Sequence, residues 1–155
     1  FPGRSIVFTD SFIELADSDQ ELLAVFFHEE GHIANRHFTR QVIQASVLNA
    51  VLFLLFGDLF GYEILASIPT LIMYLSYSRD FELEADKHSV DSLLRNDLSP
   101  SLMLSILEKI RAQSENEESK TGVEEGLSRY WSTHPPTEDR FKMIRDREAE
   151  LKKSK

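Results

Sequence analysis

The chain has 155 residues, a length that fits one globular domain with a hydrophobic core of its own. Its net charge of −9 argues against a nucleic-acid partner, because contacts to phosphates need clustered Lys and Arg. The chain has no cysteine, so disulfides are excluded and any metal ligands must come from histidines and carboxylates.

The first third of the sequence predicts a short strand followed by two helices. Ser5–Thr9 is a β-branched and aromatic run after a Pro-Gly turn, which is typical of a strand. Asp10–Ala16 fits a short helix, and Ser18 with Glu21 forms a capping box that opens a longer helix. We expect this longer helix to begin directly after Ser18 and to run past Arg36. Its core-facing stripe comprises Leu22, Val25, Phe26 and Ile33.

Residues 42–77 contain two apolar segments of 14–15 residues, separated by the sequence GDLFGYE. Each segment is shorter than the roughly 20 residues that a helix needs to span a bilayer. The pattern predicts an apolar helical hairpin. It leaves the place of that hairpin open, because such a hairpin can be buried in the core or can contact a membrane surface.

The second half of the sequence predicts three more helices. One covers roughly Tyr77–Arg95, and the Ser-Pro pair at 99–100 opens the next. Residues 114–129 are polar and acidic and are expected to form a mobile loop. Thr137 then caps a final helix. Together these elements predict one domain over residues 1–155, mainly α with a small β-sheet (α+β). We interpret it as a piece of a longer protein, because it does not begin with Met.

The sequence HEEGH, from His28 to His32, places two histidines four residues apart. Residues i and i+4 share one side of a helix, so both imidazoles can bind one Zn²⁺ and leave positions for a third ligand and water. Glu29 lies about 100° round the helix from His28, where it can take a proton from water without being a ligand. The same residues also fit a polar patch on an ordinary helix. Only a third ligand residue elsewhere in the sequence would favour the zinc site over this alternative.

A third histidine does not follow HEEGH at the spacing that some zinc proteases use, because Asn35 and Phe38 stand where Gly and His are required. A carboxylate from a later helix is the other solution. In the stretch SRDFELEADKH, Glu82 and Asp86 are four residues apart on one helix face. Glu82 could bind the metal while Asp86 accepts a hydrogen bond from a ligand histidine. A solvated acidic helix face is the alternative for this spacing.

Four stretches of the sequence carry a resemblance to a known family: FPGRSIVFTDSFIEL, ELLAVFFHEEGHIANRH, SRDFELEAD and STHPPTEDR. Together they resemble the HtpX-like and CAAX-prenyl-protease-like metallopeptidases, which include the mitochondrial inner-membrane peptidase Oma and periplasmic quality-control proteases such as BepA. The resemblance implies a gluzincin-type helical core with a small β-sheet and an HExxH helix at the active site. It also implies zinc-dependent endopeptidase activity on unfolded or membrane-associated proteins, with the bacterial cell envelope as the favoured location.

The resemblance also implies roles for individual residues. Glu82 would be the third ligand of one zinc ion per chain, with Asp86 supporting a ligand histidine and Glu29 acting as the general base. His134 would approach the metal, either as a fourth ligand that closes the site or as a donor to the oxyanion of the tetrahedral intermediate. The substrate would be an extended or unfolded polypeptide that adds to the edge of the strand at Ser5–Thr9.

Two other functions stay open on the sequence. A carboxylate-bridged di-iron protein needs two Glu-x-x-His pairs, whereas the chain has one, at Glu29 and His32, and the spacing from Glu84 to His88 does not match. A non-catalytic metal-binding or interaction module is the second alternative, and the intact Glu29 argues against it. The remaining histidines, His37 and His88, are expected to be surface or polar-contact residues.

Overall fold

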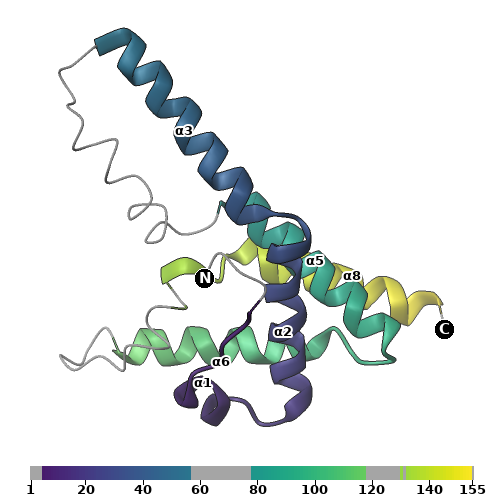
Figure 1. Ribbon diagram of the computed structural model, residues 1–155. Coiled ribbons are helices and arrows are strands. Elements are labelled where there is room, and N and C mark those ends of the chain that lie inside the picture. The colour runs from purple at the N-terminus through teal and green to yellow at the C-terminus, as the bar shows by residue number, and fades with distance from the viewer. Residues whose placement is uncertain (1–4, 57–77, 118–129, 131, 155) are drawn as a thin grey trace.

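The computed structural model describes residues 5–56, 78–117, 130 and 132–154 of the chain. Helices are the only regular elements in these stretches (Figure 1). They are α1 (Asp10–Leu15), α2 (Asp19–Ala34), α3 (His37–Phe56), α5 (Arg79–Arg95), α6 (Ser101–Glu117) and α8 (Glu138–Ser154).

The predicted small β-sheet is wrong for the part of the chain that the structure describes. Residues 5–9 have no strand partner there, and Val7 exposes 73% of its surface. Thr9 has an extended backbone, but its hydroxyl accepts a hydrogen bond from the Phe12 N–H and so caps α1. A β-branched pattern favours a local backbone shape, whereas a strand also needs another strand to pair with. The hypothesis that a substrate pairs with a strand at residues 5–9 is therefore not supported, because these residues form no strand.

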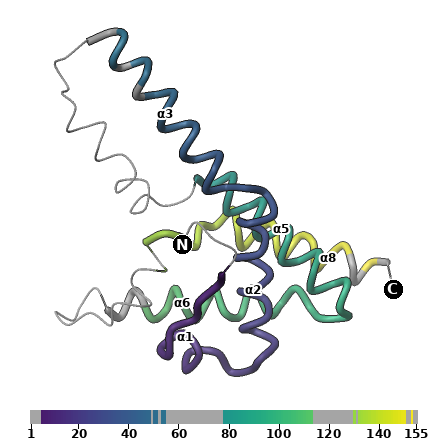
Figure 2. The backbone as a smooth tube through the Cα atoms, in the orientation of Figure 1, coloured from purple at the N-terminus to yellow at the C-terminus, as the bar shows by residue number. Residues whose placement is uncertain are grey.

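The helices α2 and α5 form the central pair, and the other described helices pack around them (Figure 1, Figure 2). α6 packs against α2 and α8, and α8 also packs against α5. α1 contacts α6. α3 contacts α2 and then extends away from the other described helices. The central pair therefore carries the packing, and α3 stands largely outside it.

The hydrophobic core lies between these packed helices. Its buried members are Phe12, Ala24, Val25, Val90, Leu93, Met103, Leu104, Ile106, Leu107, Ile110, Phe141 and Ile144. The stripe predicted for α2 is half right, because Leu22 and Val25 pack in this core but Phe26 and Ile33 expose 38% and 42% of their surfaces. The buried face of α2 comprises Glu21, Ala24, Val25, His28, Gly31 and His32. Apolar residues alone therefore identified only part of the buried face, since this face also includes histidines and a glycine.

Gly31 allows α2 and α5 to approach each other closely. A Cβ atom at Gly31 would lie 2.9 Å from the Cβ atom of His88 and 3.0 Å from the Cα atom of Ala85, both on α5. Close-packed interiors do not accommodate contacts this short, so a larger residue would push the two helices apart. The glycine of HEEGH thereby sets the histidine face of α2 directly against α5.

The long helix predicted to run past Arg36 is two helices with a break between them. The backbone and side-chain N–H groups of Asn35 both donate to the Gly31 carbonyl, at 3.0 and 2.9 Å. Arg36 has a φ of 54°, a left-handed conformation that ends a helix. α3 then begins at His37 in a new direction. Neither Gly nor Pro marks this break, so the sequence carries no strong signal for it.

The predicted capping box at the start of α2 is present in an altered form. The Glu21 N–H donates to the Ser18 hydroxyl at 3.3 Å, but the Glu21 carboxylate accepts from the Asp17 N–H at 2.8 Å. The same carboxylate accepts hydrogen bonds from Lys109 at 2.7 Å and from Ser105 at 2.6 Å. Burial raises the pKa of Glu21, but these donors outweigh it and lower the pKa below its ordinary value. A buried carboxylate thus ties α2 to α6.

Two predicted segments are only partly described. The apolar hairpin at 42–77 is described as far as Phe56, where it belongs to α3, and residues 57–77 lie outside the described residues. No described helix is long and apolar enough to cross a membrane. The first four residues of the loop predicted at 114–129 belong to α6, which continues to Glu117, and residues 118–129 lie outside the described residues.

Candidate metal centre

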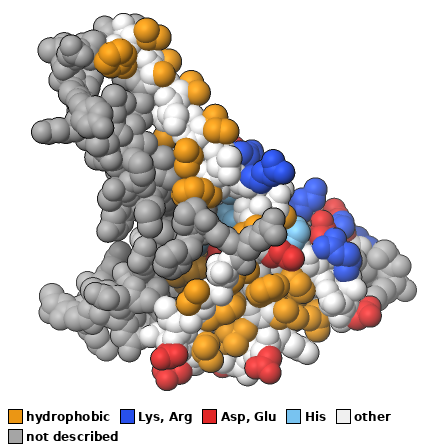
Figure 3. Space-filling model, viewed as in Figure 1, with side chains coloured by type: hydrophobic (Ala, Val, Ile, Leu, Met, Phe, Trp, Pro, Cys, Tyr) orange, Lys and Arg blue, Asp and Glu red, His pale blue; other side chains and the backbone are white. Residues whose placement is uncertain are grey.

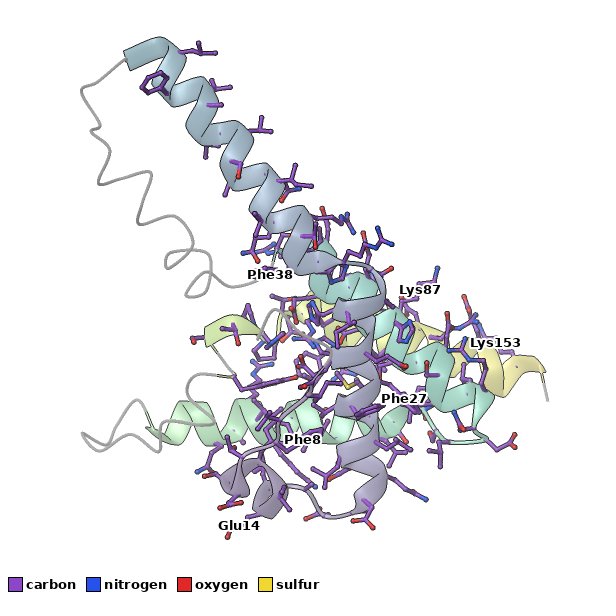
Figure 4. All side chains as sticks on the ribbon, in the orientation of Figure 1. Phe8, Glu14, Phe27, Phe38, Lys87 and Lys153 are labelled. Carbon is purple, nitrogen blue, oxygen red and sulfur yellow. The ribbon has the colours of Figure 1, made fainter. Side chains whose placement is uncertain are left out.

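Side chains from α2, α5 and the segment before α8 converge on one buried point. Figure 4 draws the side chains on these helices and labels Phe27 on α2 and Lys87 on α5. His28 and His32 come from α2, Glu82 from α5, and His134 from the turn before α8. Each offers one ligand atom, and these four atoms lie within 4.8 Å of one another. The exposed fractions are 0% for His28, 5% for His32, 2% for Glu82 and 6% for His134. The fold therefore brings together the four residues that the sequence indicates as metal ligands.

The spacing of these donor atoms suits a zinc ion. His28 Nε2 and His32 Nε2 are 3.1 Å apart. Glu82 Oε2 lies 3.5 Å from His28 Nε2, and Glu82 Oε1 lies 3.3 Å from His32 Nε2. Ligand atoms of a tetrahedral zinc site with bonds of about 2.0–2.1 Å are roughly 3.3 Å apart. Imidazoles combined with one carboxylate are also donors that zinc accepts, whereas magnesium and calcium prefer oxygen alone.

Asp86 contacts His28 on the side of the ring that points away from the other donors. Its Oδ1 atom lies 2.8 Å from His28 Nδ1, and both side chains are fully buried. His28 Nε2 is thereby left to face the other donors. A carboxylate in this position orients a ligand histidine and raises its basicity. Asp86 therefore lies against the ring nitrogen of His28 that points away from the other donors.

Burial and charge shift the pKa values of the two α2 histidines in opposite directions. Burial lowers the pKa of His28, but Asp86 and Glu82 outweigh it and raise that pKa to about 9. Burial also lowers the pKa of His32, and the nearby His28 and His134 act in the same direction, so that pKa falls to about 4 despite Glu82. In the metal-free protein at neutral pH, His28 is therefore protonated and His32 is neutral.

Glu29 lies beside the four donors. Its Oε1 atom is buried and has no hydrogen-bond partner among the described residues. His134 Nε2 is 3.7 Å from that atom, beyond hydrogen-bond length. Burial raises the pKa of Glu29, but His134, His28 and His32 outweigh it and lower the pKa. Glu29 is therefore an anion with an oxygen available to accept a proton.

Arg140 is a site residue that sequence reasoning missed. It is fully buried at the start of α8 and makes two hydrogen bonds to Asp86, of 2.6 and 2.7 Å. Its NH1 atom also lies 2.8 Å from Glu82 Oε2 and donates to the carbonyls of His134 and Pro135. Burial lowers the pKa of Arg140, but Asp86 and Glu82 outweigh this effect and raise the pKa above its ordinary value. The guanidinium therefore stays charged. The only sequence signal for it was an arginine soon after the His-Pro-Pro segment.

His37 is a second residue whose place the sequence did not show. Of the two places expected for it, the surface or a polar contact, His37 has the second, and its side chain is fully buried. Its Nδ1 atom lies 2.8 Å from His32 Nδ1, and its Nε2 atom lies 3.1 Å from Glu84 Oε2. His88 is partly exposed and contacts Glu30 at 3.2 Å. Glu84 and His88 therefore face away from the four donors, and the di-iron alternative finds no second carboxylate–histidine pair there.

His134 is held by its surroundings on several sides. Its Nδ1 atom is 3.0 Å from Glu82 Oε1, and its backbone N–H donates to the Tyr130 carbonyl at 2.8 Å. Its ring stacks on the Tyr130 ring with centroids 4.6 Å apart, and the Phe12 ring packs against the edge of Tyr130. The histidine is thus fixed beside the donors by a helical turn and an aromatic stack.

Residues 1–148 match the model of a protein family described as Peptidase family M48. The chain belongs to peptidase family M48. This match confirms the family resemblance that the HEEGH, SRDFELEAD and STHPPTEDR stretches carry.

Three M48 relatives illustrate the range of the family. The Protease HtpX homolog of Salinibacter ruber is 27% identical over 169 residues, covering 94% of this chain and 60% of that protein. The Mitochondrial metalloendopeptidase OMA1 of Arabidopsis thaliana is 28% identical, covering 92% of this chain and 27% of its own length. The CAAX prenyl protease 1 homolog of Arabidopsis thaliana is 29% identical, and the match covers 93% of this chain and 38% of that protein. The chain thus spans 27% to 60% of the length of these relatives. No solved structure matches the chain.

Arg140 should stabilise the fold as well as the site. The substitution Arg140→Met removes the guanidinium that contacts two buried carboxylates, which should lower the free energy of unfolding by about 3–5 kcal/mol. The measurement is urea unfolding of the metal-free protein. Arg145→Met is the matched control on α8, because Arg145 is exposed and its nearest carboxylate oxygen, on Glu108, is 3.6 Å away. Equal, small effects of the two substitutions would contradict the structural role of Arg140.

Proposed function

We propose that this chain is the catalytic core of a zinc-dependent endopeptidase. The observation that carries the proposal is the buried group of His28, His32, Glu82 and His134, with the anionic Glu29 beside it. Membership of peptidase family M48 supports the same chemistry. His28, His32 and Glu82 would hold one zinc ion per chain. When bound, zinc polarises a peptide carbonyl and lowers the pKa of a water molecule.

The proposed reaction gives Glu29 both proton transfers. Its Oε1 atom accepts a proton from the attacking water, and the same carboxyl then gives that proton to the nitrogen of the departing amine. The pKa of Glu29 lies below its ordinary value, so the carboxylate is in the basic form at neutral pH. Asp86 and Arg140 take no proton in this scheme. They hold His28 and Glu82 in place.

The proposed substrate is an extended or unfolded polypeptide. The four donors are at most 6% exposed, so the surface of a folded protein cannot bring a peptide bond to them. A single extended chain is narrow enough to reach a buried centre, and Glu29 offers a partly exposed side chain there. Breakdown of unfolded or membrane-associated proteins, as in protein quality control, would use such a site.

The role of Glu29 can be tested by Glu29→Gln. This variant should fold, keep about one zinc ion per chain and lose nearly all peptide hydrolysis, because the amide cannot accept the proton of water. Metal analysis and a peptide-cleavage assay measure the two effects. Glu82→Ala is the matched variant and should lose zinc as well as activity. Loss of zinc in Glu29→Gln, or full zinc binding in Glu82→Ala, would contradict the assigned roles. Zinc binding by a wild type that cleaves no peptide would instead support a non-catalytic metal-binding module.

We propose that His134 acts as a latch that closes the resting site. Its ring stands between Glu82 and Glu29, 3.0 Å from the first carboxylate and 3.7 Å from the second. A ring in this place competes with water and substrate for the space next to Glu29. The other role open to His134 is donation of a hydrogen bond to the oxyanion of the tetrahedral intermediate.

The two roles of His134 give opposite results in His134→Ala. A latch is removed by the substitution, so peptide hydrolysis should rise while the zinc content is unchanged. Loss of an oxyanion donor should lower turnover by roughly 10²–10³-fold. The value of kcat/KM for a peptide and the amount of bound zinc are measured together. A fall in kcat/KM would overturn the latch in favour of the oxyanion role, and an unchanged kcat/KM would overturn both.

We also propose that α3 contacts a membrane surface, which would suit a location at the bacterial cell envelope. The helix has no acidic residue between His37 and Phe56, and Figure 3 shows apolar side chains along it. Its exposed apolar side chains are Ile43, Val47, Leu48, Val51, Phe53 and Leu54. An exposed apolar helix without acidic residues binds favourably at the boundary between headgroups and acyl chains.

Liposome flotation tests this contact. Replacing two exposed residues together, Leu48→Ser and Leu54→Ser, should reduce the bound fraction because each loses apolar area from the interface. Val7→Ser is the control, since Val7 is 73% exposed outside α3. Flotation that is the same in all three proteins would remove the proposal, without affecting the proposed peptidase chemistry.

A further inference from the structure

The break between α2 and α3 returns the chain to the metal centre. In a continuous helix, residues five apart lie about 140° apart round the axis and do not meet. The left-handed Arg36 redirects the chain, so that His37 Nδ1 comes within 2.8 Å of His32 Nδ1. The break therefore creates a contact that neither helix alone could make.

The contacts of His32 and His37 are consistent with one arrangement of protons. His32 Nε2 faces the other donors, 3.1 Å from His28 Nε2, so a metal-binding His32 must carry its proton on Nδ1. That proton can be donated only to an acceptor, so His37 Nδ1 must be unprotonated. His37 then carries its own proton on Nε2 and donates it to Glu84 Oε2, at 3.1 Å.

The far end of this chain of contacts is also fixed. Arg40 donates to both carboxylate oxygens of Glu84, at 2.6 and 3.3 Å. The His37 ring is stacked on the Phe81 ring, with centroids 4.5 Å apart and planes 4° apart. Arg40 lies over the same Phe81 ring at 4.4 Å. His37 is thus prevented from turning by packing as well as by hydrogen bonds.

We propose that His37 is a positioning residue that fixes the Nδ1–H tautomer and the ring orientation of His32, with Glu84 and Arg40 completing the relay. The proposal rests on the proposed function, in which His32 holds zinc through Nε2. It assigns His32 the kind of support that Asp86 gives directly to His28, but passed through a second imidazole. His37 itself touches neither zinc nor substrate in this scheme.

The first test measures zinc affinity by competition with a chelator. His37→Phe keeps a flat ring for the stack on Phe81 but cannot accept a hydrogen bond, and it should weaken zinc binding roughly 10- to 100-fold. His37→Asn places an amide oxygen near the position of Nδ1, so it should retain part of the affinity and bind zinc more tightly than His37→Phe. Zinc binding by His37→Phe that is as tight as in the wild type would overturn the relay.

A matched pair of carboxylates separates the relay from helix packing. Glu84 and Glu30 are both half-exposed, and each contacts the Nε2 atom of a histidine, at 3.1 Å for His37 and 3.2 Å for His88. Glu84→Ala should weaken zinc binding, whereas Glu30→Ala should leave it unchanged. This pair also decides the question if His37→Phe does not fold. Equal effects of the two substitutions would show that packing alone is responsible and would overturn the proposal.

Nitrogen-15 NMR of the full chain gives a readout that does not depend on activity. The proposal expects the proton of His32 on Nδ1 and that of His37 on Nε2, in both the metal-free and the zinc-loaded wild type. The opposite tautomer of either ring would overturn it. If the wild type binds no zinc, the proposed function fails, and the relay fails with it as a support for a metal ligand. Normal zinc binding with the opposite tautomers overturns the relay alone.

Discussion

The close contact between α2 and α5 at Gly31 is the constraint on which the candidate metal centre depends. α2 supplies His28 and His32, and α5 supplies Glu82 and Asp86, so neither helix holds a complete set of donors. A Cβ atom at residue 31 would lie 2.9–3.0 Å from atoms of α5, closer than carbon atoms approach each other in a packed interior. Separating the helices would move Glu82 away from both histidines. The glycine is needed here because it lacks a side chain, and not because of its backbone freedom.

The buried charges of the site are arranged for binding a cation more than for stability. Glu82 and Asp86 are both buried, and Arg140 is the one buried guanidinium among the described residues that contacts them. Removing such charges from water costs more than an isolated pair usually returns. Arg140 contacts the Oε2 atom of Glu82, and the Oε1 atom of Glu82 lies 3.3 Å from His32 Nε2. The candidate site therefore keeps an excess of negative charge and a carboxylate oxygen close to the histidines, both of which favour a divalent ion.

Local patterns in the sequence were sufficient for part of this site. The i, i+4 spacing places His28 with His32, and the same spacing places Glu82 with Asp86, because a helix fixes these neighbours without help from the rest of the fold. The Ser18 cap at the start of α2 is equally local. Each of these features involves residues within one turn of a helix, and each was predicted.

Distant contacts that the family resemblance did not imply were not predicted. Arg140 and Asp86 are 54 residues apart in the chain, and His37 and Glu84 are 47 apart. Nothing near Arg140 in the sequence indicates that a charged side chain there is fully buried. The strand expected at Ser5–Thr9 failed for the same reason, because a β-branched run does not show whether a pairing partner exists. The break at Arg36 lacked the glycine or proline that usually marks such a turn.

The two α2 histidines are supported in different ways, and the difference follows from where each lies. His28 is in the interior, where Asp86 is fully buried and is neutralised by Arg140. His32 lies nearer the edge, where the available carboxylate, Glu84, is 42% exposed. Bringing that carboxylate into direct contact with His32 would bury a further charge without a buried cation to offset it. The relay that we propose through His37 avoids this cost, because a neutral ring contacts His32 while the Glu84 charge stays in solvent.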